Sequence, residues 1–297
     1  MTPTIRRARP NDAFLLALLL NSTREPHFHT TAAKLLQNIQ QHPERLLVAE
    51  QAGQLIGSVS LSFPDLHPQH VWLGFALHPD HREGGVAAEL LRLARSLAQG
   101  RPFAWTSVRA DYLSTEPDLS AMGFHEVHRT FGGGFSLDAP PTIPQRLKDT
   151  LERRGVTILP AAGLQDDPRL EALYAAVKDD KVTAEPTIPA ANEALHDQDS
   201  LWHAAFMALR SDEVLGLALP ERSGLGAWNA ALLVRQDARR QGIGTALQAR
   251  VCAALRTQGM TFLNTAGVKT DAAYLGVLRR LGANIEPDWI AYEAALA

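Results

Sequence analysis

Four landmarks occur twice in this 297-residue chain at a nearly constant separation. The repeated pairs are Gly57 and Gly216, Arg82 and Arg239, Gly85 and Gly242, and Gly123 and Gly282. The first and last pairs are 159 residues apart (216 − 57 = 159; 282 − 123 = 159), and the two middle pairs are 157 apart (239 − 82 = 157; 242 − 85 = 157). Landmarks that recur at one spacing indicate an internal duplication. The chain therefore predicts two copies of one domain of about 140–155 residues.

Hydrophobic periodicity predicts a similar order of elements in each copy, ending in helix, strand, helix and closing strand. In the first copy we expect strands at 4–8, 45–50, 54–62, 70–77 and 103–108 and helices at 11–22, 30–41 and 85–99, then a short helix before Gly123 and two strands within 124–137. In the second copy we expect strands at 155–159, 201–209, 213–220, 227–234, 260–265 and near 288–296, and helices at 166–177, 242–257 and 270–281.

A proline-containing stretch separates the two copies. Ala139-Pro140-Pro141 and Pro144 precede a helical pattern from Arg146 to Arg154, and such composition is typical of a linker. We expect an N-terminal domain at 1–138, a linker at 139–153 and a C-terminal domain at 154–297. The predicted fold class is α/β with a mixed α+β sheet: two tandem domains, each a mostly antiparallel central sheet flanked by helices.

The second copy contains a basic glycine turn between a strand and a helix. The apolar run 230–234 is followed by Arg239-Arg240-Gln241-Gly242-Ile243-Gly244-Thr245. Glycines let the backbone approach a ligand closely, and the N–H groups of a helix N-terminus attract anions. The segment 234–244 carries three arginines and one aspartate (3 − 1 = +2), whereas 77–87 carries one arginine and two acids (1 − 2 = −1). The second copy is therefore the predicted phosphate site.

The element order, together with Arg-x-x-Gly-x-Gly/Ala at the head of the central helix, resembles the GNAT superfamily of N-acetyltransferases, in a tandem arrangement. The resemblance implies that the turn binds the pyrophosphate of acetyl-CoA. The implied cofactor positions are Leu232, Leu233, Val234, Arg239, Arg240, Gln241, Gly242, Ile243, Gly244, Thr245 and Asp271. The three strand residues are expected along the pantetheine arm, and Asp271 stands where the family often has Asn, eleven residues before Gly282 (282 − 271 = 11).

The acid and base of acetyl transfer are less clear from the sequence. The family often places a tyrosine four residues before the helix-ending glycine, but here that position is Leu278. Tyr274, one turn earlier, is the candidate general acid, and Asn229 is a candidate to hold a proton-relaying water. Glu293 is a weaker candidate base, better explained as a solvated charge at a sheet edge. The acidic stretch 178–186 is a candidate wall for an amine acceptor, with a solvated loop as the alternative.

Composition narrows the partners. The net charge of −3 gives no global basic field for nucleic acid, and the longest early apolar run, 13–20, is too short to span a membrane. The lone Cys252 excludes an internal disulfide and fits a reducing cytoplasm. We expect no metal, a small-molecule or peptide amine as acceptor, and a monomer or homodimer. The alternative is a non-catalytic acyl-CoA-binding or scaffold protein with a duplicated GNAT fold.

Overall fold

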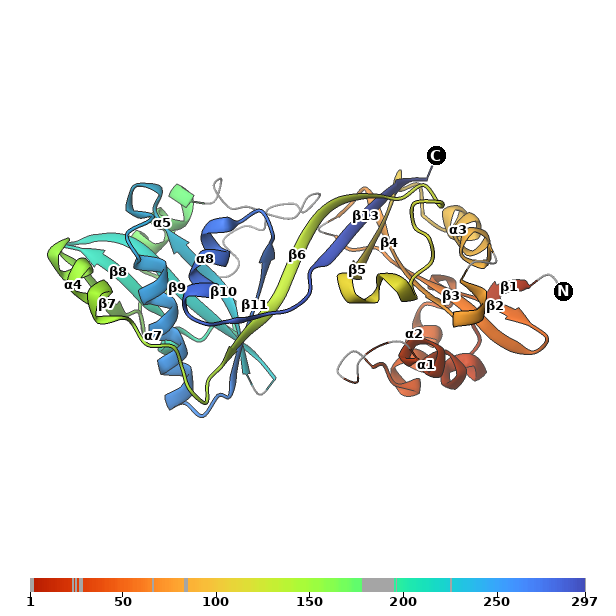
Figure 1. Cartoon of the computed structure of the whole chain (residues 1–297), viewed down its shortest axis with the longest axis horizontal. Helices are drawn as coiled ribbons and strands as arrows, with labels where there is room; N and C mark the ends of the chain where they lie inside the picture. The colour runs from red at the N-terminus through yellow and green to blue at the C-terminus, as the bar shows by residue number, and fades with distance from the viewer. Residues whose placement is uncertain are drawn as a thin grey trace. The chain divides into compact units, whose positions relative to one another are not determined.

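The computed structural model describes residues 3–296 except 23, 25, 27, 28, 66, 83, 84, 178–194, 196 and 225. The described residues form two compact units (Figure 1). The first unit runs to Arg129 and resumes at Pro287, and the second runs from Thr130 to Glu286.

The first unit is a mixed sheet with helices packed on it. Its strands are β1 (Thr4–Arg7), β2 (Leu46–Gln51), β3 (Gln54–Ser62), β4 (His70–Leu77), β5 (Phe103–Arg109) and β13 (Trp289–Ala295), in the order β1-β2-β3-β4-β5-β13. Its α-helices are α1 (Ala13–Asn21), α2 (Ala32–Gln41) and α3 (Val86–Ser96). Only β4 and β5 among these neighbours are parallel.

The second unit repeats the plan. Its strands are β6 (His125–Ser136, entering from the first unit), β7 (Val156–Pro160), β8 (Phe206–Arg210), β9 (Glu213–Ser223), β10 (Gly226–Val234), β11 (Phe262–Val268) and β12 (Asn284–Ile285), in the order β6-β11-β10-β9-β8-β7, with β12 beside β6. Its described α-helices are α4 (Gln145–Arg153), α5 (Pro168–Val177), α7 (Ile243–Thr257) and α8 (Ala272–Arg280).

The closing strands differ from the expectation. Strand β13 was expected to finish the second copy, but it pairs antiparallel with β5 of the first unit along its whole length. In return, β6 is one long strand rather than two, and its residues 130–136 pair antiparallel with β11. Local periodicity predicts that a segment is extended but does not fix its partner, because edge strands of both copies offer equivalent unpaired groups.

Three consecutive glycines, Gly132 to Gly134, make the pairing of β6 with the strands of the second unit possible. Gly133 pairs with Thr265 of β11 on one side and with Ile285 of β12 on the other. Its φ is +137°, and a Cβ at this position would lie 2.0 Å from the main-chain oxygen of Asn284. Only glycine therefore permits β12 to approach β6 this closely.

Each sheet is covered by helices on both faces, because residues alternate between two apolar clusters. In the second unit, Leu215 and Ala218 pack toward α7, whereas Leu217 and Leu219 pack toward α5.

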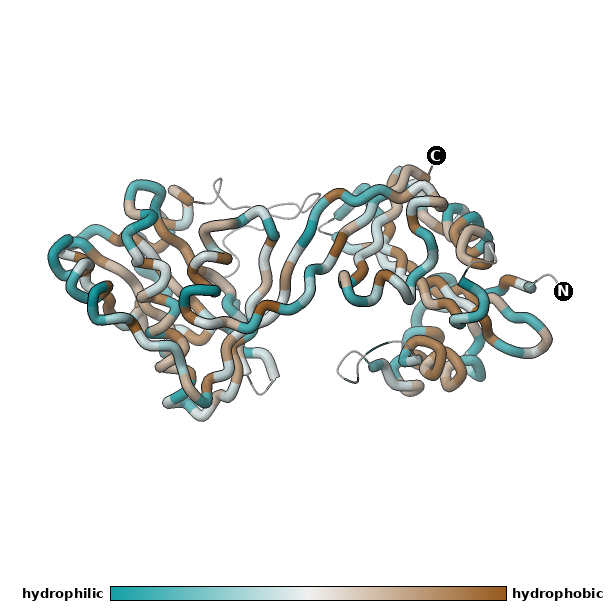
Figure 2. The backbone as a smooth tube through the Cα atoms, in the orientation of Figure 1, coloured by the Kyte–Doolittle hydropathy of each residue, from teal (hydrophilic) through white to brown (hydrophobic). Residues whose placement is uncertain are grey.

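In the first unit, α1 is apolar all round, which makes its tube mostly brown in Figure 2. Its outer face exposes Phe14, Leu15 and Leu18. No helix among the described residues has both the length and the apolarity needed to cross a bilayer.

Two further expectations need correction. The strand expected at 201–209 begins only at Phe206, because 202–204 form a 3-10 turn in which His203 is exposed and bonds Gln258. The short helix expected before Gly123 is a 3-10 segment, Ala110–Thr115, that ends well before the glycine. The helical pattern in the linker is realised as α4, which packs against β7.

Candidate functional site

The glycine turn has the same backbone conformation in both units. Gly242 is the N-cap of α7 with φ +85° and ψ 4°, and Gly85 is the N-cap of α3 with φ +75° and ψ 1°. This left-handed conformation is the reason that each turn carries glycine. In the second unit Arg240 also has a positive φ of 62°, which costs a non-glycine residue about 1–2 kcal/mol. Strain of this kind is concentrated at functional sites.

The first turn of α7 presents free donors. The first intrahelical bond is donated by the N–H of Ala246 to the carbonyl of Gly242, so the N–H groups of 243–245 have no partner within the helix. No side chain caps this end, whereas the N-cap Asp271 caps α8. Uncapped N–H groups at a helix N-terminus favour an anion.

The arginines of the turn play different parts. Arg239 donates from Nε to the main-chain oxygen of Val234 at 3.0 Å and ties the turn to β10. Arg235 is ion-paired with Glu213 and Asp237, so it adds little net positive charge. Arg240 is exposed and has no hydrogen bond or ion pair with any residue that the structure describes. Arg280, which the sequence reasoning missed, reaches from α8 to Thr245 Oγ1 at 3.5 Å.

Leu147 of α4 packs directly on the glycine turn. A Cβ on Gly242 would lie 2.3 Å from Leu147 Cδ1, whereas a Cβ on Gly85 would meet nothing within 4 Å. Gly244 is less crowded, because a Cβ there would meet Val234 and Val277 at ordinary contact distances of 3.6 Å. The linker helix is thus part of the wall of this turn.

Strands β10 and β11 separate after Trp228, along the part of β10 that leads to the turn. They are parallel and pair only at Ala227–Leu263 and Trp228–Asn264. On its other edge β10 pairs with β9, with a bulge that leaves Ala230 unmatched. The N–H of Arg235 bonds the carbonyl of Leu215, and alternation therefore turns the polar groups of Leu232 and Val234 toward the open edge. On the side of β11, the fork leaves the polar main-chain groups of Leu232 without a strand partner among the described residues, the arrangement needed to bind an extended ligand by its amides.

The two candidate catalytic residues meet at this fork. Asn229 Nδ2 donates to the hydroxyl oxygen of Tyr274 at 2.8 Å and to Gln248 Oε1 at 2.9 Å. The Tyr274 hydroxyl also bonds Thr265 Oγ1, so it bridges the first unpaired residues of β10 and β11. Burial raises the pKa of Tyr274, which keeps the phenol protonated. The Asn229 Oδ1 and Gln248 Nε2 atoms are buried without a hydrogen-bond partner.

Asp271 has a structural role at the N-terminus of α8. Its Oδ1 accepts from the main-chain N–H of Tyr274 at 2.8 Å and caps α8. Leu278, at the position where the family often has tyrosine, is fully buried in the core. Gln248 and Thr265 were not singled out from the sequence. The sequence signal that could have identified Gln248 is a polar residue directly after Leu247, within the mostly apolar pattern of α7.

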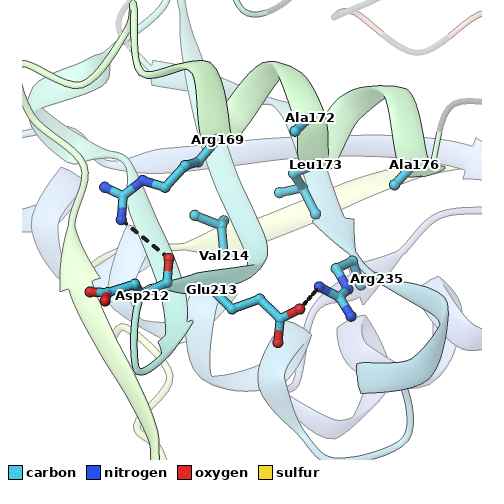
Figure 3. A pocket seen from close by; sticks show the side chains of 8 residues that line it. All are labelled: Arg169, Ala172, Leu173, Ala176, Asp212, Glu213, Val214 and Arg235. Atoms are coloured by element: carbon cyan, nitrogen blue, oxygen red, sulfur yellow. Dashed lines mark hydrogen bonds and ion pairs between the residues drawn. The ribbon is translucent and has the colours of Figure 1, made fainter.

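The concave feature shown in Figure 3 is a separate, open pocket of about 280 Å³ between α5 and the turn at Asp212 and Glu213. Its arginines are already engaged: Arg169 bonds the Asp212 carbonyl, and Arg235 pairs with Glu213. It lies on the α5 face, whereas the glycine turn caps α7 on the opposite face. The pocket therefore offers no free cation to a phosphate.

The remaining candidates lie elsewhere. Glu293 belongs to the first unit, where its Oε2 lies 2.7 Å from His70 Nε2, so it is neither at the β10–β11 fork nor a solvated edge charge. The acidic stretch 178–186 falls outside the described residues. Among the described residues, no three His, Cys, Asp or Glu side chains gather as metal ligands would.

Two segments of the chain, residues 13–128 and 169–283, each match the model of the acetyltransferase (GNAT) family. The chain belongs to the GNAT family. No curated protein sequence matches it. The two matched segments correspond to the two copies that the repeated landmarks predict.

Solved structures confirm the tandem GNAT fold. A GCN5-related N-acetyltransferase from Sphaerobacter thermophilus is 16% identical, with a TM-score of 0.69, over 99% of this chain and 96% of that chain. A tandem GNAT protein from the clavulanic acid biosynthesis pathway is 16% identical, with a TM-score of 0.55, over 99% of both chains. A glucosamine N-acetyltransferase region of a fungal multi-domain β-N-acetylglucosaminidase is 14% identical, with a TM-score of 0.61, over 98% of this chain and 38% of that chain. At these identities the similarity shows the fold alone.

Proposed function

We propose that this GNAT protein is an acetyl-CoA-dependent N-acetyltransferase that transfers acetyl to a primary amine of a small molecule or peptide. The observation that carries the proposal is the uncapped, left-handed glycine turn at Gly242 beside the fork between β10 and β11. The free N–H groups at 243–245 and the unpaired Arg240 suit a pyrophosphate. The open edge at Leu232 suits the amide groups of a pantetheine arm.

The donor set of the second unit fits this cosubstrate, because both its diphosphate and its pantetheine arm have counterparts among the groups at the turn and the fork. Arg240, Arg280 and the first-turn amides would hold the diphosphate, and the main chain from Leu232 to Val234 would hold the arm. Gln241 is partly engaged, since its Nε2 donates to the Asp237 carbonyl. We keep Arg239 as a positioning residue, because its bond to Val234 holds the turn against β10.

Acetyl-CoA supplies an activated acyl thioester, and the protein has to position it and move protons. In the transfer the amine nitrogen forms a bond to the acyl carbon, the carbon–sulfur bond breaks, and the sulfur takes a proton. Tyr274 is the proposed donor of that proton, because its buried phenol stays protonated. The unpartnered Asn229 Oδ1 is the proposed acceptor for a water that removes the amine proton. Asp271 orients Tyr274 by capping the helix that carries it.

We also propose that the N-terminal domain spans 1–138, the linker 139–153 and the C-terminal, cofactor-binding domain 154–297, with the closing strands exchanged between the two. A cytoplasmic location is supported by Cys252, which is a free thiol in the core of the second unit.

Calorimetric titration with coenzyme A tests the proposal. We expect binding that weakens by about two- to fivefold in Arg240→Gln, because one near-surface cation contributes about 0.5–1 kcal/mol. Arg250→Gln is the matched control: it removes an exposed arginine from α7, about 10 Å along the axis from the start of that helix, and should leave the affinity unchanged. No detectable binding at millimolar coenzyme A would refute the assignment.

If coenzyme A binds, release of free thiol from acetyl-CoA in the presence of a panel of amines measures turnover. Amine-dependent release supports the transferase. Binding with no release for any amine would favour the alternative, a non-catalytic acyl-CoA-binding protein.

A further inference from the structure

We propose that the first unit contains a binding site for an organic ammonium ligand, built from His67, His70, Trp72, Trp105 and Glu293. We call these five residues the indole–imidazole cluster. All five belong to the first unit, and Glu293 reaches it on the exchanged strand β13. The proposal requires no bound acyl-CoA and is independent of the proposed transferase activity.

The sheet register places three of these side chains in one row. Trp72 of β4 lies opposite Trp105 of β5, and Trp105 lies opposite Glu293 of β13. Directly paired residues project from the same face of a sheet. The indole ring centroids of Trp72 and Trp105 are 6.5 Å apart, and the two rings are nearly parallel. The ring centroid of His67 lies 4.9 Å from that of Trp72. Two electron-rich indoles thus stand beside a carboxylate.

The carboxylate of Glu293 lacks a fixed counter-charge. It is 22% exposed and its partner is the ring of His70. In the part of the chain that the structure describes, no arginine or lysine forms an ion pair with it. The nearby Arg101 donates to the main-chain oxygens of His67 and His70 instead. A partly buried carboxylate without a cation is costly unless a ligand supplies one.

His70 offers a second group without a partner in the cluster. Its side chain is 4% exposed, and Nε2 is 2.7 Å from Glu293 Oε2. When Nε2–H donates to the carboxylate, Nδ1 is left as a lone-pair acceptor. That Nδ1 is buried without a partner. Burial also lowers the pKa of His67, so this ring stays neutral. The His70 Nδ1 and the Glu293 carboxylate therefore accept hydrogen bonds or positive charge.

Trp72 makes the cluster accessible, because 37% of this residue is exposed. Indole faces attract ammonium groups, and an adjacent carboxylate strengthens the attraction. The chemistry that fits is a protonated amine carried on an apolar or aromatic body. This is also the chemical class that the proposed reaction acetylates.

Three probes with the same ring test the inference on the full-length protein without acyl-CoA: phenethylamine, 2-phenylethanol and phenylacetate. Calorimetry and tryptophan fluorescence should show binding of the amine at least about tenfold tighter than of the alcohol, the effect of about 1.4 kcal/mol from the charge. Failure of the amine to bind at about 10 mM, equal affinity for amine and alcohol, or tighter binding of phenylacetate would each overturn the proposal.

Variants localise the site. Glu293→Gln and Trp72→Ala should each weaken amine binding by about tenfold. Trp228→Ala is the matched control, because Trp228 is the last residue of β10 that pairs with β11 and is also 37% exposed, yet has no ring contact among the described residues. Equal losses in Trp72→Ala and Trp228→Ala would overturn the proposal. Trp72→Ala, at a partly exposed position, keeps the test valid if Glu293→Gln does not fold.

Discussion

The exchange of strands depends on a glycine that a single methyl group should disable. Gly133 lies between β11 and β12, with φ +137°. In Gly133→Ala the new Cβ would be 2.0 Å from the Asn284 oxygen and 3.0 Å from its carbonyl carbon. Because both are main-chain atoms, no side-chain rotation relieves the overlap. Gly132→Ala is the control, since its Cβ would meet only Glu286 Oε2, a flexible side-chain atom, at 3.4 Å.

The expected cost follows from two terms. The unfavourable φ contributes about 1–3 kcal/mol, and displacing β12 from β6 contributes about 1–3 kcal/mol as overpacking or lost ladder bonds. Gly133→Ala should therefore lose about 2–6 kcal/mol of unfolding free energy. Gly132→Ala should be near neutral or slightly stabilising, because alanine restricts the unfolded chain by about 0.4–1 kcal/mol relative to glycine.

Scanning calorimetry checks this difference, because a loss of unfolding free energy lowers the midpoint of the thermal transition. At about 2–4 °C per kcal/mol for a unit of this size, the midpoint should fall by roughly 4–24 °C in Gly133→Ala. The midpoint of Gly132→Ala should stay within about 4 °C of the parent protein. If the two variants have the same transition temperature, the close approach of β12 to β6 is not what requires glycine, and the reasoning fails.

Three further predictions concern the candidate active site of the second unit and the response of stability to pH. Tyr274→Phe should lower the rate of acetyl transfer by about 10²-fold or more while leaving coenzyme A affinity unchanged in calorimetry, because only proton donation is lost; an unchanged rate would exclude the phenol as the acid. Asp271→Ala should cost about 0.5–2 kcal/mol by removing the cap of α8, as measured by thermal unfolding, whereas Asp271→Asn should retain most of it. Burial raises the pKa of Glu116 to about 7, so its folded form binds a proton more tightly than the unfolded chain and stability falls as pH rises from about 4.5 through 7. Glu116→Gln should therefore be more stable than the parent by about 1–3 kcal/mol at pH 8 and lose that advantage near pH 5; denaturant unfolding at both values decides it.

The duplicated plan could be predicted because its signals are local. A glycine before an apolar helix indicates a left-handed N-cap, and Gly85 and Gly242 share this conformation in the structure. The central helices begin and end within a few residues of their predicted bounds. Each of these features depends on residues that are close in sequence.

The partners of the closing strands could not be predicted, because pairing is a long-range property. The segment Trp289–Ala295 has the pattern of a strand in any sheet, and nothing within it favours β5 over β11. The glycines at 132–134 signal a close backbone approach, but their pattern does not name the chain that approaches. Arg280 was missed for the same reason, since only the packing of α8 brings it to Thr245.

The structure brings together two candidate catalytic residues, Asn229 and Tyr274, that the sequence predicts separately. They are 45 positions apart in the chain, yet they share a hydrogen bond. Their buried neighbours Gln248 and Thr265 carry no family signal and became visible only with the fork between β10 and β11.

The two units differ in the sign of charge that their unsatisfied groups attract, and this asymmetry favours a division of labour after duplication. In the second unit the turn leaves amide donors and Arg240 unengaged, and both attract an anion. In the first unit Arg82, the counterpart of Arg239, donates to the Ser114 carbonyl at 3.2 Å, and the counterpart of Arg240 in the sequence is the acidic Glu83. The indole–imidazole cluster meanwhile leaves a carboxylate and a ring nitrogen without a cation. A copy that had only decayed into a packing partner would be under no constraint to keep a partly buried carboxylate bonded to a buried imidazole, because replacing both by apolar side chains costs little. Their presence is better explained by a ligand of opposite charge in each unit.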